Sequence, residues 1–238
     1  MNLFNSIKTH LVNHLPKIVN RSGKVSYSQS GEDLIVDYIM SGLKISQPSY
    51  LDIGAHHPIA LSNTYLFYQK GCKGVCIEPD PLLHSQIKKT RKRDICLNVG
   101  AGISHETSAD FFVMTSKTLN TFSRDEAERY QKYKNQKIEH IIQVPLIPIN
   151  EIISDYFSFY PNFISLDVEG LDFAILQSLD FKKYRPEVFC VETLTYTEDN
   201  TETKIQEIIE FMISKGYMAY ADTYINTIFV DEKIWKNR

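Results

Sequence analysis

The sequence predicts an α/β fold built around a mostly parallel sheet. Short apolar runs rich in β-branched and aromatic residues alternate with segments of helical period along most of the chain, which is the pattern of βα units. The composition supports the same class, because 238 residues with 43% hydrophobic and 23% charged side chains suffice for one globular domain with a sizeable core. It argues against a disordered or fibrous chain.

The predicted elements follow one another in the order expected of βα units. Strands are predicted at residues 50–53, 74–78, 95–99, 163–167 and 188–192, with helices at 63–70, 81–92 and 171–179. Pro81 suits the first turn of its helix, because the N–H that proline lacks would be unpaired there in any case. A helix over 201–215, stopped by Gly216, then precedes a closing hairpin of strands at 217–221 and 227–230.

Two segments lie outside this rhythm. Residues 1–25 carry apolar side chains at helical spacing together with four basic residues. We expect an amphipathic helix that packs on the domain or on a second subunit of a homo-oligomer, with weak contact to an anionic membrane surface as the alternative. Residues 26–238 are predicted to form a single domain. Within it, 104–143 is an insertion of the length typical of a lid or substrate wall, with a β-ribbon at 111–114 and a helix opened by a capping box from Ser123 to Glu126.

Charge and cysteine content argue against several classes of partner. A net charge of −3 and a pI near 6.2 give no basic field that would recruit nucleic acid. The basic run at 88–93 is interpreted as the solvated end of a helix. The four cysteines form no CxxC pair, so neither a structural zinc site nor a disulfide framework is expected. No apolar run approaches the ~18 residues of a membrane span and no secretory signal is recognised, so we expect a cytoplasmic protein.

Polar residues and glycines collect where the predicted strands end. In open α/β sheets, ligands bind at the carboxyl ends of the strands, where the strand order reverses. The residues that close or follow strands one to four are Asp52, Gly54, Ala55 and His56; Glu78, Pro79 and Asp80; Asn98, Val99 and Gly100; and Asp167 with Glu169. An acidic residue that closes the second strand usually binds a ribose, because one carboxylate accepts hydrogen bonds from two hydroxyls. We therefore expect a ligand that contains a nucleoside.

The loop after the first strand distinguishes two classes of such ligand. A dinucleotide brings a pyrophosphate, which needs several glycines so that backbone amides can approach it. Here His56, His57 and Pro58 follow Gly54, and proline lacks the N–H that a phosphate would use. S-adenosylmethionine, which has a ribose and no phosphate, fits this loop better. The plain alternative is that the acids at the strand ends are purely structural.

Five stretches occur in a characteristic order: YSQSGEDLIV, YLDIGAHHPIALSNTYLFYQKGCKGVCIEPDP, LNTFS, FISLDVEGLDFAIL and FCVET. Over about residues 27–192 the chain thereby resembles the FkbM-type methyltransferases, a branch of the class I S-adenosylmethionine-dependent enzymes. The resemblance implies a Rossmann-like fold: a seven-stranded, mostly parallel sheet with its last strand antiparallel and helices on both faces. It also implies methyl transfer, usually to a hydroxyl oxygen, with Gly54, Glu78 and Asn98 among the cofactor contacts. Many members have Asn and Gly where this chain has His56 and Pro58.

Residues 28–33, SQSGED, precede the first predicted strand. We expect Ser30 to cap the following helix, with Asp33 in the first turn. Capping does not account for the neighbouring polar residues, and in the family this segment can fold over the cofactor. Gln29 and Ser30 are therefore further candidates to contact it.

Three carboxylates are candidates to remove the proton of a hydroxyl acceptor. Asp167, Glu169 and Glu192 are expected near the same crevice, and Asp167 is ranked first. His56 is the alternative, because imidazole exchanges a proton near neutral pH. The carboxylates could also orient sugar hydroxyls or hold a divalent ion, so a metal is left open and none is assigned. For Glu169 the plain alternative is capping of the next helix.

These residues together predict a cytoplasmic S-adenosylmethionine-dependent O-methyltransferase that acts on a hydroxyl of a sugar or glycan precursor. The LNTFS stretch at 119–123 offers polar groups and an aromatic face to such an acceptor. Two alternatives stay open. One is a dinucleotide-dependent oxidoreductase, and the other is a non-catalytic module that binds the cofactor or a glycan.

Overall fold

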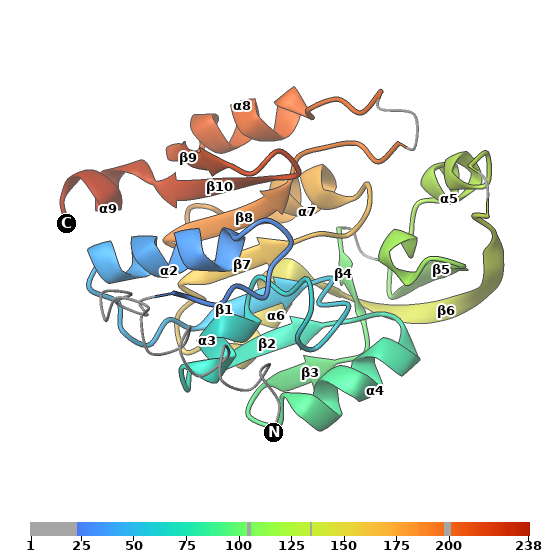
Figure 1. Cartoon of the computed structure of the whole chain (residues 1–238), viewed down its shortest axis with the longest axis horizontal. Helices are drawn as coiled ribbons and strands as arrows, with labels where there is room; N and C mark the ends of the chain where they lie inside the picture. The colour runs from blue at the N-terminus through green and yellow to red at the C-terminus, as the bar shows by residue number, and fades with distance from the viewer. Residues whose placement is uncertain (1–22, 104–105, 134, 198–200) are drawn as a thin grey trace, which may run out of the picture.

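The computed structural model describes residues 23–103, 106–133, 135–197 and 201–238. Its centre is a seven-stranded sheet of order β3-β2-β1-β7-β8-β10-β9 (Figure 1). The parallel strands are β1 (Tyr50–Ile53), β2 (Gly74–Ile77), β3 (Ile95–Leu97), β7 (Phe163–Leu166) and β8 (Val188–Glu192). β10 (Asn226–Asp231) runs antiparallel to β8 and to β9 (Tyr217–Asp222). The predicted seven-stranded sheet and its antiparallel last strand are confirmed.

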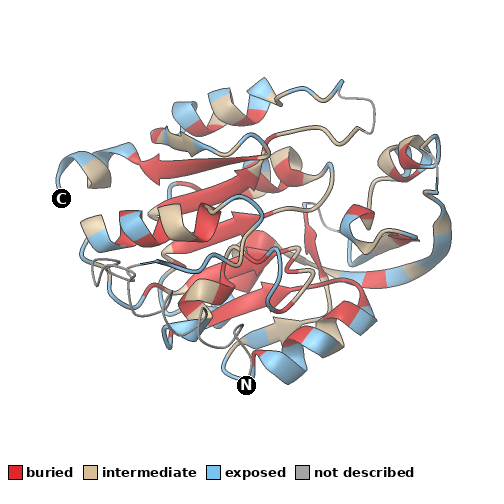
Figure 2. Cartoon of the chain, viewed as in Figure 1, coloured by how far each residue is buried: buried red, intermediate tan, exposed pale blue. Residues whose placement is uncertain are grey.

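Helices cover both faces of this sheet, as predicted. α2 (Glu32–Gly42) and α3 (Tyr65–Gln69) pack on the face that carries Tyr50 and Phe163, and α4 (Pro81–Thr90) joins them beside β2. α6 (Ile149–Tyr156), α7 (Asp172–Ser178) and α8 (Gln206–Ser214) cover the opposite face around Leu51 and Ile164. α9 (Glu232–Lys236) ends the chain. Because both faces are covered, the central strands are buried throughout and read as continuous apolar runs (Figure 2).

The strand order reverses between β1 and β7. The chain runs outward from β1 to β2 and β3, and then returns to β7 on the other side of β1. The stretch of chain that connects β3 to β7 forms a second sheet, of order β4-β6-β5, which lies at the right of Figure 1. Its strands are β4 (Gly100–Gly102), β5 (Ser108–Met114) and β6 (Ile138–Pro148), accompanied by the short helix η1 (Lys117–Leu119) and by α5 (Arg124–Tyr130). The insertion thus stands beside the point at which ligands bind in sheets of this kind.

Several element boundaries differ from the prediction for identifiable reasons. The third strand ends at Leu97, because the Asn98 amide donates hydrogen bonds to the carbonyls of Glu78 (2.9 Å) and Pro79 (2.8 Å). The helix predicted over 201–215 begins only at residue 206, because Thr203 pairs with Thr195 in the preceding loop. The helix predicted over 63–70 spans residues 65–69. The strands β4 and β6 and the helices α6 and α9 were not predicted from the sequence.

The two predicted helix caps have different outcomes. Ser30 does not cap α2, whose N-cap is Gly31; the Ser28 hydroxyl instead accepts from the N–H groups of Gly31 (3.1 Å) and Asp33 (3.3 Å). Ser123 does cap α5, accepting from the N–H of Glu126 at 3.2 Å. The capping box is only half formed, because Glu126 pairs with Arg129 instead of reaching back to Ser123.

Of the N-terminal helix predicted over residues 1–25, residues 1–22 lie outside the described residues, and residues 23–25 are not helical. Among the helices that are described, none has both the length and the apolar character needed to cross a bilayer.

Candidate functional site

A cavity of about 390 Å³ opens at the carboxyl edge of the main sheet. The last paired level of the four central strands consists of Ile53, Ile77, Leu166 and Val191. One residue further along each strand come Gly54, Glu78, Asp167 and Glu192, and all four line the cavity. The opposite walls come from the insertion, the loop after β8 and the β9–β10 turn, with Phe111, Leu119, Phe122, Tyr196 and Tyr224 among their residues. The volume lies within the range of small-molecule sites.

Strained backbone is concentrated around this cavity. Six non-glycine residues of the described chain have positive φ, and four of them line the cavity: His56 (48°), Leu61 (58°), Glu169 (55°) and Tyr224 (76°). Such conformations cost roughly 1–3 kcal/mol each and persist where the surrounding structure enforces them, most often at functional sites. Their gathering at one cavity singles it out as the functional site.

Glu78 supplies a buried hydrogen-bond acceptor at the end of β2. One carboxylate oxygen accepts from the N–H of His56 and the other from the N–H of Asp80, both at 2.8 Å. Burial raises the pKa of Glu78 to about 7, although these two hydrogen bonds work against the shift. Each oxygen keeps a free lone pair, so the carboxylate can still accept from two ligand hydroxyls.

An apolar slot lies beside Glu78. It is lined by Ile77, Leu83, Ala101, Phe111 and Phe122. The rings of Phe111 and Phe122 lie 4.7 Å apart, centroid to centroid. A flat heteroaromatic ring attached to a ribose fits such a slot, so the residues present suit a nucleoside such as the adenosyl group of S-adenosylmethionine.

Three carboxylates converge at the other end of the cavity. Asp167, Glu169 and Glu192 each place one oxygen within 4.8 Å of the other two. Burial raises the pKa of all three, the charge of Asp167 adds to the shift of Glu169 and Glu192, and the charge of Asp52 adds to that of Asp167. The pKa of Asp167 rises only to about 6, because the Glu192 carboxyl donates a hydrogen bond to it. Near neutral pH the cluster can therefore carry charge on Asp167 and a proton on Glu192. An acidic cluster does not by itself define a metal site, and none is assigned.

Gly54 allows the two ends of the site to lie close together. Its φ is 81°, and a Cβ at this position would lie 1.8 Å from the carbonyl oxygen of Asp167. Any other residue would push the loop after β1 away from the loop after β7. The absence of a side chain therefore brings the carboxylate cluster next to the His56 turn.

His56 and His57 have different places in this turn. His56 lines the cavity, and burial is the main cause that lowers the pKa of its imidazole, so the ring is neutral at physiological pH. The Nδ1 atom of His57 accepts from the N–H groups of Ile59 (3.1 Å) and Ala60 (2.8 Å). His57 thus shapes the loop, whereas His56 is available to a ligand.

The predicted cofactor residues divide into two groups. Those that line the cavity are Gln29, Gly54, His56, Glu78, Pro79 and Asp167, whereas Ser30, Asp52, Ala55, Asp80, Asn98, Val99 and Gly100 do not line it. Ser30 is exposed. Asp80 caps α4, accepting from the N–H groups of Leu82 (2.8 Å) and Leu83 (3.3 Å). Asn98 braces the end of β2, as described above. Asp80 and Asn98 thus hydrogen-bond to Glu78 and Pro79, which do line the cavity.

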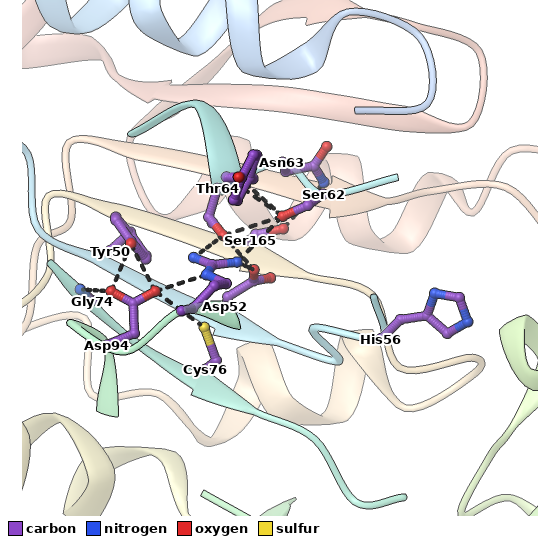
Figure 3. A network of polar contacts seen from close by, with 12 residues as sticks. Tyr50, Asp52, His56, Ser62, Asn63, Thr64, Gly74, Cys76, Asp94 and Ser165 are labelled. Carbon is purple, nitrogen blue, oxygen red and sulfur yellow. Dashed lines mark hydrogen bonds and ion pairs between the residues drawn. The ribbon is translucent and has the colours of Figure 1, made fainter. Parts of the chain in front are cut away.

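Asp52 belongs to a buried polar network between the sheet and the ends of α3 and α4 (Figure 3). It accepts a hydrogen bond from the Thr64 hydroxyl and lies 3.5 Å from the Arg91 guanidinium. Arg91 donates to Asp94 (2.8 Å) and to Thr64 (2.8 Å), and Asp94 also accepts from the Tyr50 hydroxyl at 2.8 Å. Arg91 is 0% exposed, so the reading of 88–93 as a solvated helix end is wrong at this residue. Figure 3 shows His56 well apart from the network.

Other cavity residues were found only partly by sequence reasoning. Within the LNTFS stretch, Leu119, Asn120 and Phe122 line the cavity. Tyr196 and Tyr224 come from segments without a local motif, and only the folded chain brings them to the site. No local signal in the sequence would have found these two.

The sheet order, the cavity at its switch point and the acid that ends β2 without a phosphate loop define a class I methyltransferase. The sequence model of the methyltransferase FkbM domain matches residues 52–218, most of the chain, and the chain belongs to this family. It is an S-adenosylmethionine-dependent methyltransferase. The dinucleotide-dependent oxidoreductase weighed from the sequence is thereby set aside.

Solved structures of similar fold include several methyltransferases. One is an O-methyltransferase from Bacillus cereus in complex with S-adenosylhomocysteine (TM-score 0.42, 12% identity, covering 95% of this chain and 89% of that one). Another is a TehB-like methyltransferase from Corynebacterium glutamicum (TM-score 0.44, 8% identity, 96% of each chain). A third is the 1,6-didemethyltoxoflavin-N1-methyltransferase of Burkholderia thailandensis (TM-score 0.42, 8% identity, covering 85% and 79%). No curated protein matches the sequence significantly.

Proposed function

We propose that the protein transfers a methyl group to a hydroxyl oxygen of a sugar or glycan precursor. The observation that carries this proposal is the carboxylate cluster of Asp167, Glu169 and Glu192 in the same cavity as Glu78. A hydroxyl must lose its proton as it is methylated, and a cluster of acids can take that proton and also accept hydrogen bonds from neighbouring hydroxyls.

The cofactor would lie along the carboxyl edge of the sheet. Glu78 would accept hydrogen bonds from the ribose hydroxyls, and the slot around Phe111 and Phe122 would hold the adenine. Gln29 and His56 would face the methionine end, where Gly54 leaves room. When bound, S-adenosylmethionine supplies an electrophilic methyl group on a sulfonium. The residues of the chain fix the acceptor and the proton.

Asp167 is the proposed base. With a pKa of about 6 it is ionised at neutral pH and yet basic enough to share a proton with a hydroxyl. With S-adenosylmethionine bound, Asp167 would take the hydroxyl proton as the acceptor oxygen bonds to the methyl carbon and the carbon–sulfur bond breaks. The products are a methyl ether and the neutral thioether S-adenosylhomocysteine. His56 is the alternative base.

The remaining lining supports a polyhydroxylated acceptor. Thr118, Thr195 and Thr197 contribute hydroxyl groups to the cavity, and Tyr196 and Tyr224 contribute aromatic rings. Aromatic rings and hydroxyl groups together suit the faces and edges of a sugar. Cys72, Cys76 and Cys190 are buried free thiols, which suits a reducing compartment such as the cytoplasm.

The test combines an acceptor panel with one variant. The protein is incubated with S-adenosylmethionine carrying a ¹³C-labelled methyl group and with sugars and nucleotide sugars that bear hydroxyls, amines or both. The product spectrum then distinguishes O-methyl from N-methyl groups. Asp167→Asn should keep its affinity for S-adenosylhomocysteine and lose turnover, while Asp155→Asn, at an exposed acid on α6, should behave as wild type. Methylation on nitrogen, or full activity of Asp167→Asn, would overturn the proposal.

A further inference from the structure

The insertion contacts the carboxylate cluster through two side chains. The Tyr130 hydroxyl donates to Oε2 of Glu169 at 2.7 Å, and the Thr121 hydroxyl donates to the backbone carbonyl of Glu169 at 2.8 Å. Tyr130 is 1% exposed and Thr121 is 0% exposed. Building on the function proposed above, we propose that the insertion positions the carboxylate cluster by holding Glu169 at both its side chain and its backbone, with Tyr130 and Thr121 as positioning residues.

Glu169 needs such support because its own segment does not fix it. β7 ends at Leu166, and Glu169 stands in the left-handed region (φ 55°), followed by Gly170 (φ 98°). The sequence left open that Glu169 caps the next helix, but it does not. The N-cap of α7 is Leu171, and the Asp172 carboxylate accepts from the N–H of Val168 instead. The Glu169 side chain is therefore free to face the cluster, and its hydrogen bonds to the insertion determine where it lies.

The donors on the insertion are themselves held firmly. Tyr130 packs in an apolar cluster with Phe112, Met114 and Leu119, and its ring meets that of Tyr196 edge-on at 5.6 Å. α5 also lies directly against the Glu169 loop, because a Cβ on Gly170 would be 2.9 Å from Cγ of Glu126. The insertion is thus a packed support for the carboxylates as well as a wall of the cavity.

The Tyr130 hydrogen bond has a direct electrostatic consequence. A phenol donates to the ionised carboxylate and so favours that form, against the burial and the Asp167 charge that raise the pKa of Glu169. Because the three acids titrate together, loss of this donor should raise the apparent pKa of the whole cluster. A residue that only filled space would not have this effect.

Tyr130→Phe removes the hydroxyl and keeps the ring. With the acceptor found by the panel above, the acidic limb of kcat/KM should move upward by roughly one pH unit or more. The same shift should appear in the ¹³C NMR titration of side-chain carboxyls in protein labelled at glutamate, with Glu169 assigned through Glu169→Gln. Affinity for S-adenosylhomocysteine should change by less than about twofold, since Tyr130 does not line the cavity.

Tyr133→Phe is the matched control, because Tyr133 also packs on Tyr196 (5.8 Å) while its hydroxyl faces Arg129 at 3.4 Å. It should leave the titration unchanged. If Tyr130→Phe does not fold, Thr121→Val and Thr121→Ser repeat the comparison at the backbone contact, and the serine should restore the wild-type titration. An unchanged titration in Tyr130→Phe, or an equal shift in Tyr133→Phe, overturns the inference. The NMR titration needs no acceptor, so an incorrect acceptor class would leave its result intact.

Discussion

Replacement of Arg91 by methionine should destabilise the fold strongly. The guanidinium is fully buried and lies against two carboxylates, at 2.8 Å from Asp94 and 3.5 Å from Asp52. Methionine keeps much of the side-chain length and removes the charge, which leaves both acids buried without a cation. Breaking such a pair costs about 3–5 kcal/mol. Asp94 would keep the Tyr50 hydroxyl and the Gly74 N–H as hydrogen-bond donors. We therefore expect the free energy of unfolding to fall by about 4 kcal/mol, which lowers Tm by roughly 8–16 °C for a chain of this size.

The assay is denaturant unfolding and calorimetry of wild type and Arg91→Met at pH 5.5 and 7.5. An uncompensated buried carboxyl has a folded-state pKa above its unfolded value, so its penalty grows as pH rises between the two. The stability gap between variant and wild type should therefore be wider at pH 7.5. Lys92→Met, at the exposed next residue, should stay within about 0.5 kcal/mol of wild type. If Arg91→Met loses no more stability than Lys92→Met, the buried network is not what holds this end of α4.

Three further variants test the site. Asp52→Asn should lower Tm yet leave the affinity for S-adenosylhomocysteine within about twofold, since Asp52 does not line the cavity; a loss of affinity with unchanged Tm would instead support the predicted role of Asp52 as a cofactor ligand. Glu78→Gln should weaken that affinity about tenfold or more, and wild-type affinity measured by calorimetry should fall as pH drops below about 7, where Glu78 takes up a proton. In the absence of ligand, the stability of the fold depends on pH in the opposite direction. The folded state binds the Glu78 proton more tightly than the unfolded chain does, so the free energy of unfolding falls as pH rises from 4.5 toward 7. The glutamine variant should lack this contribution. Gly54→Ala should abolish cofactor binding in a thermal-shift assay, because its Cβ would lie 1.8 Å from the carbonyl oxygen of Asp167. Gly71 also has a left-handed backbone but open space around it, so Gly71→Ala should lower the free energy of unfolding by only about 1 kcal/mol and leave cofactor binding intact. Equal effects of the two variants on binding and stability would mean that backbone strain alone matters.

The sequence predicted the parts of the fold that local pattern controls. The five parallel strands are short apolar runs, of which all but the edge strand β3 are buried on both faces, and each was found within one or two residues. β6 was missed because Pro145 and Pro148 interrupt it and most of its residues are not buried, so neither strand propensity nor alternation stands out. Its pairing with β5 depends on the chain returning after α5, which no short window of sequence records.

Arg91 shows how a local pattern can be overridden. Within the run KKTRKR five residues are exposed, as predicted, and Arg91 alone is buried. Leu83, Ile87 and Arg91 follow one another at intervals of four, so they share the face of α4 that packs on the sheet. The helical spacing was present in the sequence. The acids that make burial of this arginine tolerable come from β1 and from the residue just before β3, and only the folded structure brings them together.

Position along the strand explains why Asp52 and Glu78, both assigned to the cofactor from sequence, have different surroundings. In the ladder Asp52 pairs with Cys76, two residues before Glu78, and alternate residues of a strand share one face of the sheet. Asp52 therefore lies on the same face as Glu78 but about 7 Å deeper in the sheet. At that depth the neighbours of Asp52 are Arg91 and Thr64. Glu78 instead lies one residue beyond the last paired level of the strands, in line with Gly54, Asp167 and Glu192, which also line the cavity. An acid near a strand end can therefore be assigned to ligand binding only once the last paired level of the sheet is known, and that level is set by the partner strands.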